Sequence, residues 1–195
     1  VFDSGEDYNH PALKSKFHGN VKGFKNSWSG GSDRPFDVGG HGTHVTGTIC
    51  GLDVLNSDTI GVAFNATWMG GPIQFRNSPT QPHKVKTFIE NFQYALNPDG
   101  DVTTIDDMPD VINNSWGDTI TFDCNIQDPF TEVFKAFELA GIANVWSAGN
   151  DGPNSNTVKY YHGLNYSLVS GFSVGATNNY FPYKIADFSS RGPSD

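Results

Sequence analysis

Hydrophobic residues recur at spacings of three and four in two stretches of the chain. The first stretch runs from Pro82 to Leu96, and its apolar positions are Val85, Phe88, Ile89, Phe92 and Leu96. The second stretch has apolar residues at Phe130, Val133, Phe134 and Phe137. Such spacing predicts two amphipathic helices that each bury one face. Gly141 is well placed to end the second helix.

Short runs with the composition of β-strands alternate with these helices. They lie at 66–69, 111–115, 142–147, 172–177 and 185–189. Alternating helices and strands favour βαβ units with right-handed crossovers, and hence a parallel sheet with helices on both faces. We therefore predict an α/β fold of three layers, α/β/α, with a mainly parallel sheet. The acidic stretch from Pro98 to Pro109 has no hydrophobic period and is predicted to be a surface loop.

The overall composition narrows the classes of partner. The chain has 195 residues, enough for one domain with a sizeable core, and no stretch has the composition of an interdomain linker. Its net charge is -9 and its 12 lysines and arginines are dispersed, which argues against a nucleic-acid partner. No apolar run approaches the ~18 residues of a membrane span, so we expect no membrane partner. An acidic surface suits a secreted, soluble protein.

The cysteine content is too low for a disulfide scaffold. Cys50 and Cys124 permit at most one internal disulfide. Two buried free thiols explain the pair equally well, so the sequence leaves both the pairing and the redox compartment open.

Three polar islands carry the candidate chemistry. His41 lies in the run Gly39–Val45, where glycines form a turn that leads into an apolar helix, and an imidazole placed there is a candidate general base. Asp3 would end a short strand near the start of the sequence, and Asn150 would follow another strand. Functional groups of parallel α/β sheets collect at the carboxyl ends of strands, and all three islands fit that rule.

In the order Asp, His, Asn, the three islands resemble the subtilisin-like serine proteases. The runs 9–13 (NHPAL), 41–48 (HGTHVTGT) and 111–117 (VINNSWG) are most similar to the bacillopeptidase F branch of that family. The resemblance implies a subtilisin-like fold and a secreted serine endopeptidase whose catalysis needs no cofactor. It also implies that Asp3 orients His41, that His41 takes the proton of a serine, and that the Asn150 amide stabilises the oxyanion.

The same resemblance implies where a protein or peptide substrate binds. In the family an extended peptide lies along the strand that here is Ser115, Trp116 and Gly117. The pocket for the residue before the scissile bond lies between that strand and Ala148–Gly149. Trp116 could equally be a core tryptophan, because large aromatic residues fill cores as readily as they line clefts. Three residues fall near the expected floor of the pocket: Tyr160, Tyr161 and His162.

The nucleophile is not found in its family motif. In subtilisin-like proteases it lies in a Gly-Thr-Ser-Met-Ala sequence beyond the motif that here is 188–193 (FSSRGP), and this sequence stops at Asp195. We therefore expect residues 1–195 to be a partial catalytic domain that lacks an N-terminal segment and a downstream serine-bearing segment. The downstream segment would be its partner, and the piece alone would be inactive. Gly171–Gly175 has the G-x-S-x-G spacing of a nucleophile elbow, but no histidine follows Ser173 as those hydrolases require.

Other interpretations of the same residues stay open. A degenerate subtilase would serve as a binding or structural module instead of an enzyme. His41 and His44 are three residues apart and could bind a metal ion, although no motif marks a third ligand. The family also often binds structural calcium near the loop after the histidine helix, and a solvated acidic loop is the alternative there. The oxygen-bearing residues of that loop are Asp53, Asn56, Ser57 and Asp58.

Overall fold

The computed structural model describes residues 1–73, 85–117, 129–163, 167 and 171–193. The chain divides into two compact units, Val1–Pro109 and Asp110–Asp195.

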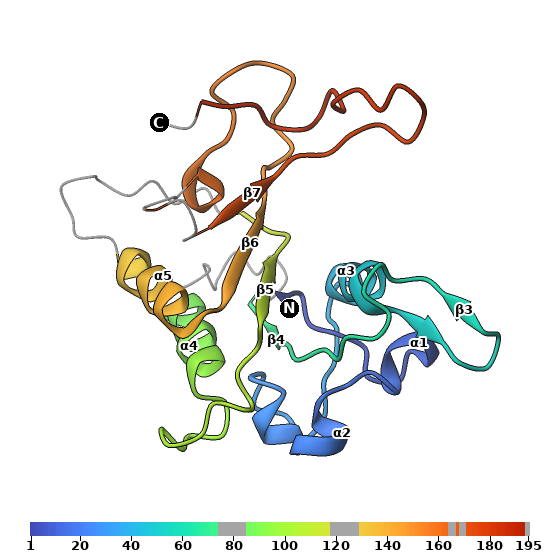
Figure 1. Cartoon of the computed structure of the whole chain (residues 1–195), viewed down its shortest axis with the longest axis vertical. Helices are drawn as coiled ribbons and strands as arrows, with labels where there is room; N and C mark the ends of the chain where they lie inside the picture. Colours follow the sequence, from blue (N-terminus) through green and yellow to red (C-terminus); the bar gives the residue numbers. More distant parts are fainter. Residues whose placement is uncertain (74–84, 118–128, 164–166, 168–170, 194–195) are drawn as a thin grey trace. The chain divides into compact units, whose positions relative to one another are not determined.

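The first unit contains a short parallel strand pair that ends at Asp3. Strand β1 (Phe2–Asp3) pairs in parallel with β4 (Gly71–Pro72), with Phe2 opposite Gly71 and Asp3 opposite Pro72. Strands β2 (Leu52–Asp53) and β3 (Asp58–Thr59) form a separate antiparallel pair (Figure 1). The helices of this unit are α1 (Pro11–Lys14), α2 (Gly19–Lys22), a 3₁₀ helix (Phe24–Asn26), α3 (His41–Cys50) and α4 (Val85–Leu96).

Aromatic residues form much of the core of the first unit. Its buried cluster consists of Tyr8, Leu13, Phe17, Trp28, Cys50 and Trp68. The rings of Phe17 and Trp68 lie 4.5 Å apart, and the Trp68 indole donates a 2.8 Å hydrogen bond to the Leu13 carbonyl. Helix α4 buries Phe88 and Phe92, and the Phe92 ring meets Phe2 of β1 edge-on. The hydrophobic spacing therefore predicted the buried face of α4 correctly, while residues 82–84 lie outside the described residues.

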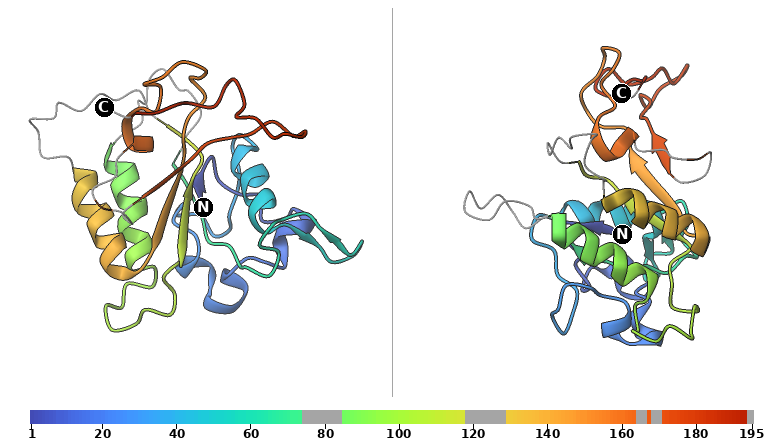
Figure 2. Two further views of the ribbon diagram at one scale, coloured as in Figure 1. Left: turned by 45° about the horizontal axis from the view of Figure 1, so that its top comes forward. Right: turned by 90° about the vertical axis from the view of Figure 1, so that its left-hand side faces the viewer.

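The second unit is built on a three-stranded parallel sheet with the order β5-β6-β7. Its strands are β5 (Val111–Asn114), β6 (Ala143–Ser147) and β7 (Phe172–Val174). Helix α5 (Pro129–Ala140) packs against β6 and completely buries three phenylalanines, Phe130, Phe134 and Phe137 (Figure 2). A 3₁₀ helix spans Tyr160–Gly163. Gly141 follows α5 with a φ of 76°, a left-handed conformation that favours glycine, which confirms the predicted helix end.

Parallel pairing in both units, together with helices, confirms the predicted α/β class. Two strand predictions are wrong. Residues 66–69 form no strand, because Trp68 makes only an isolated bridge with Phe17 and turns its side chain into the core; the strand β4 begins at Gly71.

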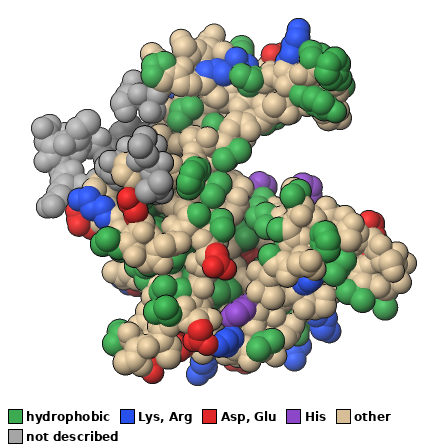
Figure 3. Space-filling view, viewed as in Figure 1, with side chains coloured by type: hydrophobic (Ala, Val, Ile, Leu, Met, Phe, Trp, Pro, Cys, Tyr) green, Lys and Arg blue, Asp and Glu red, His purple; other side chains and the backbone are tan. Residues whose placement is uncertain are grey.

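The predicted strand at 185–189 is also absent from the described part of the chain. Ile185 makes one antiparallel bridge with Thr177, and the backbone then turns, with the Ser189 N–H donating to the Ala186 carbonyl. Phe181 and Ile185 of this loop are exposed. Figure 3 shows hydrophobic side chains on the surface of the molecule in green. The apolar composition that predicted a strand here therefore does not reflect a buried position. Residues 98–109 contain no helix or strand, as predicted.

Candidate active site

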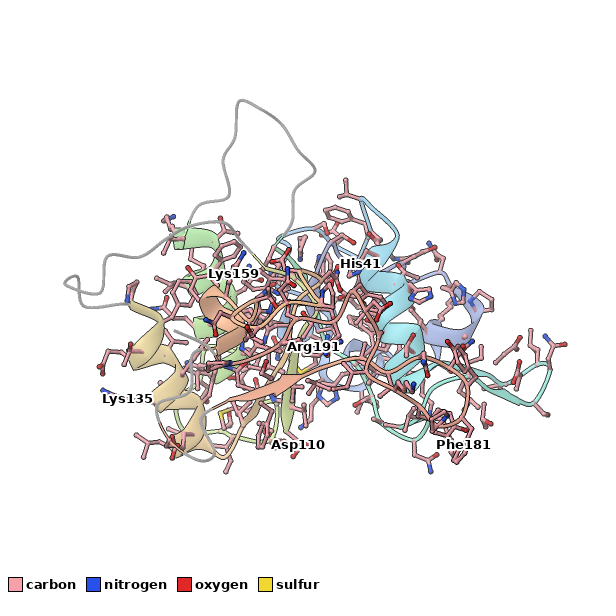
Figure 4. The ribbon with its side chains drawn as sticks, turned by 90° about the horizontal axis from the view of Figure 1, so that it is seen from above. His41, Asp110, Lys135, Lys159, Phe181 and Arg191 are labelled. Carbon is pink, nitrogen blue, oxygen red and sulfur yellow. The ribbon has the colours of Figure 1, made fainter. Side chains whose placement is uncertain are left out.

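Asp3 and His41 form a close contact in the first unit. Asp3 is the last residue of β1 and is completely buried. His41 is the first residue of α3 (Figure 4). The distance from Asp3 Oδ1 to His41 Nδ1 is 2.7 Å, and the same oxygen accepts a 2.7 Å hydrogen bond from the Ser4 N–H. Because an ionised carboxylate only accepts hydrogen bonds, Nδ1 carries the hydrogen. The imidazole side chain is 56% exposed, which leaves its Nε2 edge available to accept a proton.

Glycine at position 42 lets α3 approach β1 this closely. A Cβ placed on Gly42 would lie 2.1 Å from the Gly5 carbonyl oxygen, too short for a side chain, and 3.0 Å from Asp3 Cβ, which is a tight contact. Gly40 precedes the helix with a φ of 80°, a left-handed conformation that favours glycine. These glycines position His41 over Asp3.

Asp37 holds the start of α3 in place, and the sequence analysis missed it. Its carboxylate accepts hydrogen bonds from the Gly39 and Gly40 N–H groups at 2.8 Å each. It also accepts from the Thr43 N–H at 2.9 Å and the Thr43 hydroxyl at 2.6 Å. Gly40 has no side chain to cap the helix, so Asp37 satisfies N–H groups that would otherwise lack partners. An aspartate just before a Gly-Gly turn was the signal that could have revealed it.

Ser4 joins the Asp37 network to the Asp3–His41 contact. Its hydroxyl donates a 2.8 Å hydrogen bond to Asp37 Oδ1 and accepts one of 2.9 Å from the Gly42 N–H. Ser4 also follows Asp3 directly. Its hydrogen bonds therefore link the segment after β1 to the first turn of α3 beside the Asp3–His41 contact.

We expect Asp37→Ala to destabilise the protein in a pH-dependent manner. Burial raises the pKa of Asp37, but hydrogen bonds from Thr43, Ser4 and Gly39 outweigh it, and the pKa lies below its ordinary value of 3.8. A lowered folded-state pKa stabilises the fold above the unfolded value, and this stability is lost as pH falls through the folded pKa. The free energy of unfolding should fall by about 1–3 kcal/mol at neutral pH, and the difference should shrink below pH 3.8.

Urea unfolding of the full-length protein at several pH values measures this effect. Asp33→Ala is the matched control, because Asp33 is an exposed aspartate of the same loop. A destabilisation by Asp37→Ala that stayed the same at every pH would contradict the proposed role of the carboxylate charge.

A second carboxyl group lies close to Asp3. Glu6 is completely buried, and burial raises its pKa well above the ordinary value. Its protonated, neutral form is therefore favoured, and in that form it adds no negative charge beside Asp3. No pattern in the sequence indicates that this glutamate is buried.

The second unit carries Asn150 in a loop after β6. Asn150 is exposed, and Gly149 before it has a φ of 99°. Ser190 holds this loop: its N–H donates to the Gly149 carbonyl, and its hydroxyl accepts from the Asp151 N–H, each at 3.0 Å. Ala148 donates its N–H to the Val174 carbonyl at 2.8 Å. The predicted oxyanion donor therefore lies on a backbone fixed by several hydrogen bonds.

The predicted substrate strand continues β5. The Ser115 hydroxyl accepts a 3.0 Å hydrogen bond from the Asn113 side chain, and Gly117 is exposed. The Trp116 side chain is buried, with its ring 4.9 Å from that of Trp146. Its side chain thus belongs to the core of the unit, as the alternative interpretation had it, and only its backbone remains available for a peptide.

Ser173 does not lie on a nucleophile elbow. It is the middle residue of β7, paired with Trp146 of β6. An elbow serine needs a sharp turn between a strand and a helix, and the middle of a strand does not provide one.

The side chains predicted to bind metal ions, and Cys50, have the following environments. His44 is exposed on α3, and Asp53 accepts hydrogen bonds from the Leu55 and Asn56 N–H groups of its own turn. Among the described residues, no three His, Cys, Asp or Glu side chains gather closely enough to hold a metal ion. Calcium and metal binding stay predictions. Cys50 is a buried free thiol, and Cys124 lies outside the described residues.

Comparison with known proteins decides the family. The model of the subtilase family, Peptidase_S8, matches residues 1–195. The chain belongs to the subtilase family. It is 33% identical to bacillopeptidase F of Bacillus subtilis over 98% of its length, and 28% identical to the serine protease AprX of the same organism over 100%. It also resembles the solved structure of the S41 psychrophilic protease, with a TM-score of 0.70 and 26% identity over 98% of the chain.

The relatives of this subtilase chain are longer than the chain itself. It covers 14% of bacillopeptidase F, 42% of AprX and 58% of the S41 protease. The likeness extends over nearly all of residues 1–195, and confirms the recognition of a subtilase similar to bacillopeptidase F. Within the described residues, no helix is long and apolar enough to cross a membrane.

Proposed function

We propose that this chain is part of the catalytic domain of a serine endopeptidase that hydrolyses peptide bonds of protein substrates. The observation that carries the proposal is the 2.7 Å contact between Asp3 Oδ1 and His41 Nδ1, with the rest of the imidazole exposed. A buried carboxylate that fixes the tautomer of an accessible imidazole is the arrangement a serine needs for activation. Membership of the subtilase family supports the same reaction.

Each of the candidate residues is proposed to have its own role in the reaction. Asp3 orients the imidazole and stabilises its protonated form, and His41 takes the serine proton through Nε2 and later gives it to the leaving amine. The exposed Asn150 would donate its amide hydrogen to the oxyanion. Backbone groups of Ser115–Gly117 and of Ala148–Gly149 would bind the peptide on either side of the residue before the scissile bond.

The serine is proposed to come from a downstream segment of the same enzyme. A Gly-Thr-Ser-Met-Ala motif does not occur among residues 1–195. None of Asp3, His41 and Asn150 can replace an activated hydroxyl, so this piece alone is proposed to be inactive. The alternative is a subtilase fragment that serves as a binding or structural module.

Fluorophosphonate labelling of the full-length protein tests the function. We expect one stoichiometric adduct on a serine in a Gly-Thr-Ser peptide outside residues 1–195, together with hydrolysis of a protein substrate. Peptide mass analysis identifies the modified residue. An unlabelled, inactive full-length protein would favour the binding module. An adduct at Ser173 would overturn the proposed source of the nucleophile.

A secreted location is proposed as well. It rests on the family resemblance and on the net charge of -9, which suits a soluble extracellular enzyme. Activity in the culture medium of the source cells, compared with their lysate, would test it.

A further inference from the structure

The imidazole of His162 lies beside both walls of the pocket that the proposed function assigns to the substrate. A Cβ placed on Gly117 would lie 2.3 Å from His162 Nε2. A Cβ placed on Gly149 would lie 3.9 Å from His162 Cδ2. Gly117 and Gly149 belong to the two predicted substrate-binding segments, and all three residues belong to the second unit. The ring therefore fills the space of a side chain at Gly117 and reaches ordinary van der Waals distance at Gly149, where Ser190 Oγ is nearer, at 2.9 Å.

Contacts on the other edge of the ring hold His162 in this orientation. Its Nδ1 hydrogen bonds to the carbonyl of Ser147, the last residue of β6. A carbonyl only accepts, so Nδ1 is the donor and Nε2 is the nitrogen turned toward Gly117. The ring also meets the Trp146 ring edge-on, at 6.0 Å and 88°. An imidazole fixed by a hydrogen bond and an aromatic contact resists displacement by a substrate side chain.

The same ring borders a cavity of about 350 Å³ in the second unit. Ala148 and Ser190 also line this cavity, and Ala148 is one of the predicted substrate-binding residues. Because His162 borders the cavity and fills the space beside Gly117, removal of its ring would extend the cavity toward Gly117.

Burial favours a neutral imidazole at this position. Burial lowers the pKa of His162, while the Ser147 carbonyl and the Asp151 carboxylate act in the opposite direction. The neutral form offers no positive charge to an acidic side chain. The ring therefore acts on the pocket through its volume.

We propose that His162 determines specificity: its ring limits the pocket to small residues before the scissile bond and excludes large aromatic ones. This inference rests on the proposed function. From the sequence alone, His162 is only one of three residues near the expected pocket floor. The position of its ring beside Gly117 and Gly149 distinguishes it from the other two residues.

Peptide anilides that differ only in the residue before the scissile bond, alanine or phenylalanine, test the inference in the full-length enzyme. The wild type should prefer alanine. His162→Ala should raise the ratio of kcat/KM for phenylalanine over alanine by about 10- to 100-fold, the range that a change of pocket volume produces. His162→Asn keeps a donor for the Ser147 carbonyl and should raise the same ratio by less. This variant tests the inference if the alanine variant does not fold.

His18→Ala is the matched control, because His18 is a half-buried histidine of the first unit and should leave the ratio unchanged. Fluorophosphonate titration counts active sites in every variant. A protein that neither reacts with fluorophosphonate nor cleaves any anilide refutes the proposed function itself. An active, titratable enzyme that prefers phenylalanine as wild type, or whose ratio is unchanged in both His162 variants, overturns only the role of His162.

Discussion

Replacing His41 with alanine in the full-length enzyme is expected to lower kcat by at least ~10⁴-fold. The physical reason is that no other group in the described part of the first unit contacts Asp3 as an accessible base; the Asp3–His41 contact of 2.7 Å is specific to this imidazole. Without it the serine hydroxyl keeps its proton and is a weak nucleophile. Steady-state kinetics with a peptide anilide, normalised to folded protein, measures the loss.

Asp3→Asn should lower kcat by a comparable amount, since an asparagine amide can favour the wrong imidazole tautomer. The double variant should cost little more than the more severe single one, because the two groups act as a unit. His44→Ala is the matched control: His44 lies on the same helix, is exposed, and should leave kcat unchanged. If the losses of kcat in the single variants added in the double variant, Asp3 and His41 would not act as a unit. A large loss of kcat in His44→Ala would favour a metal site formed by His41 and His44.

Asn150→Leu is expected to lower kcat by ~10²–10³-fold with little change in KM, the size known for the oxyanion-hole asparagine of a subtilisin. The amide donates to charge that develops only in the transition state, so its removal should spare substrate binding. The Gly149–Asp151 backbone is held by Ser190 and should keep its conformation when the side chain changes.

Asn154→Leu controls for the exchange of an exposed asparagine in the same loop region. Its kcat and KM should both stay near the wild-type values. A rise in KM with unchanged kcat in Asn150→Leu would show that Asn150 contacts the ground state, and the oxyanion role would then be wrong.

Periodicity predicted the long elements well because their pattern and their packing agree. The phenylalanines of α5 recur at helical spacing, and those at 130, 134 and 137 are all completely buried. The strands at 66–69 and 185–189 failed for the opposite reason. The Trp68 side chain is buried in the core, but its backbone forms only an isolated bridge and no strand. Ile185 is exposed despite its high β-propensity.

The candidate site shows the same limit. Asp3 and His41 were identified because their motifs are local in sequence, and their contact spans 38 positions. Asp37 acts through hydrogen bonds from N–H and hydroxyl groups, and its place before Gly39 and Gly40 is the one local signal that separates it from Asp33. The position of His162 depends on packing between segments near 117, 149 and 162, which no local pattern encodes.

The division of the chain at Pro109 places the groups proposed to transfer the proton, and the aspartate that holds the start of α3, in a different unit from the groups proposed to bind peptide. Asp3, Asp37 and His41 belong to the first unit, and Asn150 and His162 to the second. Proteins open locally in cooperative segments whose free energies are smaller than that of global unfolding. A partial opening of the second unit could therefore abolish turnover while the hydrogen bonds around the imidazole persist. Inactivation on heating would then precede the main calorimetric transition.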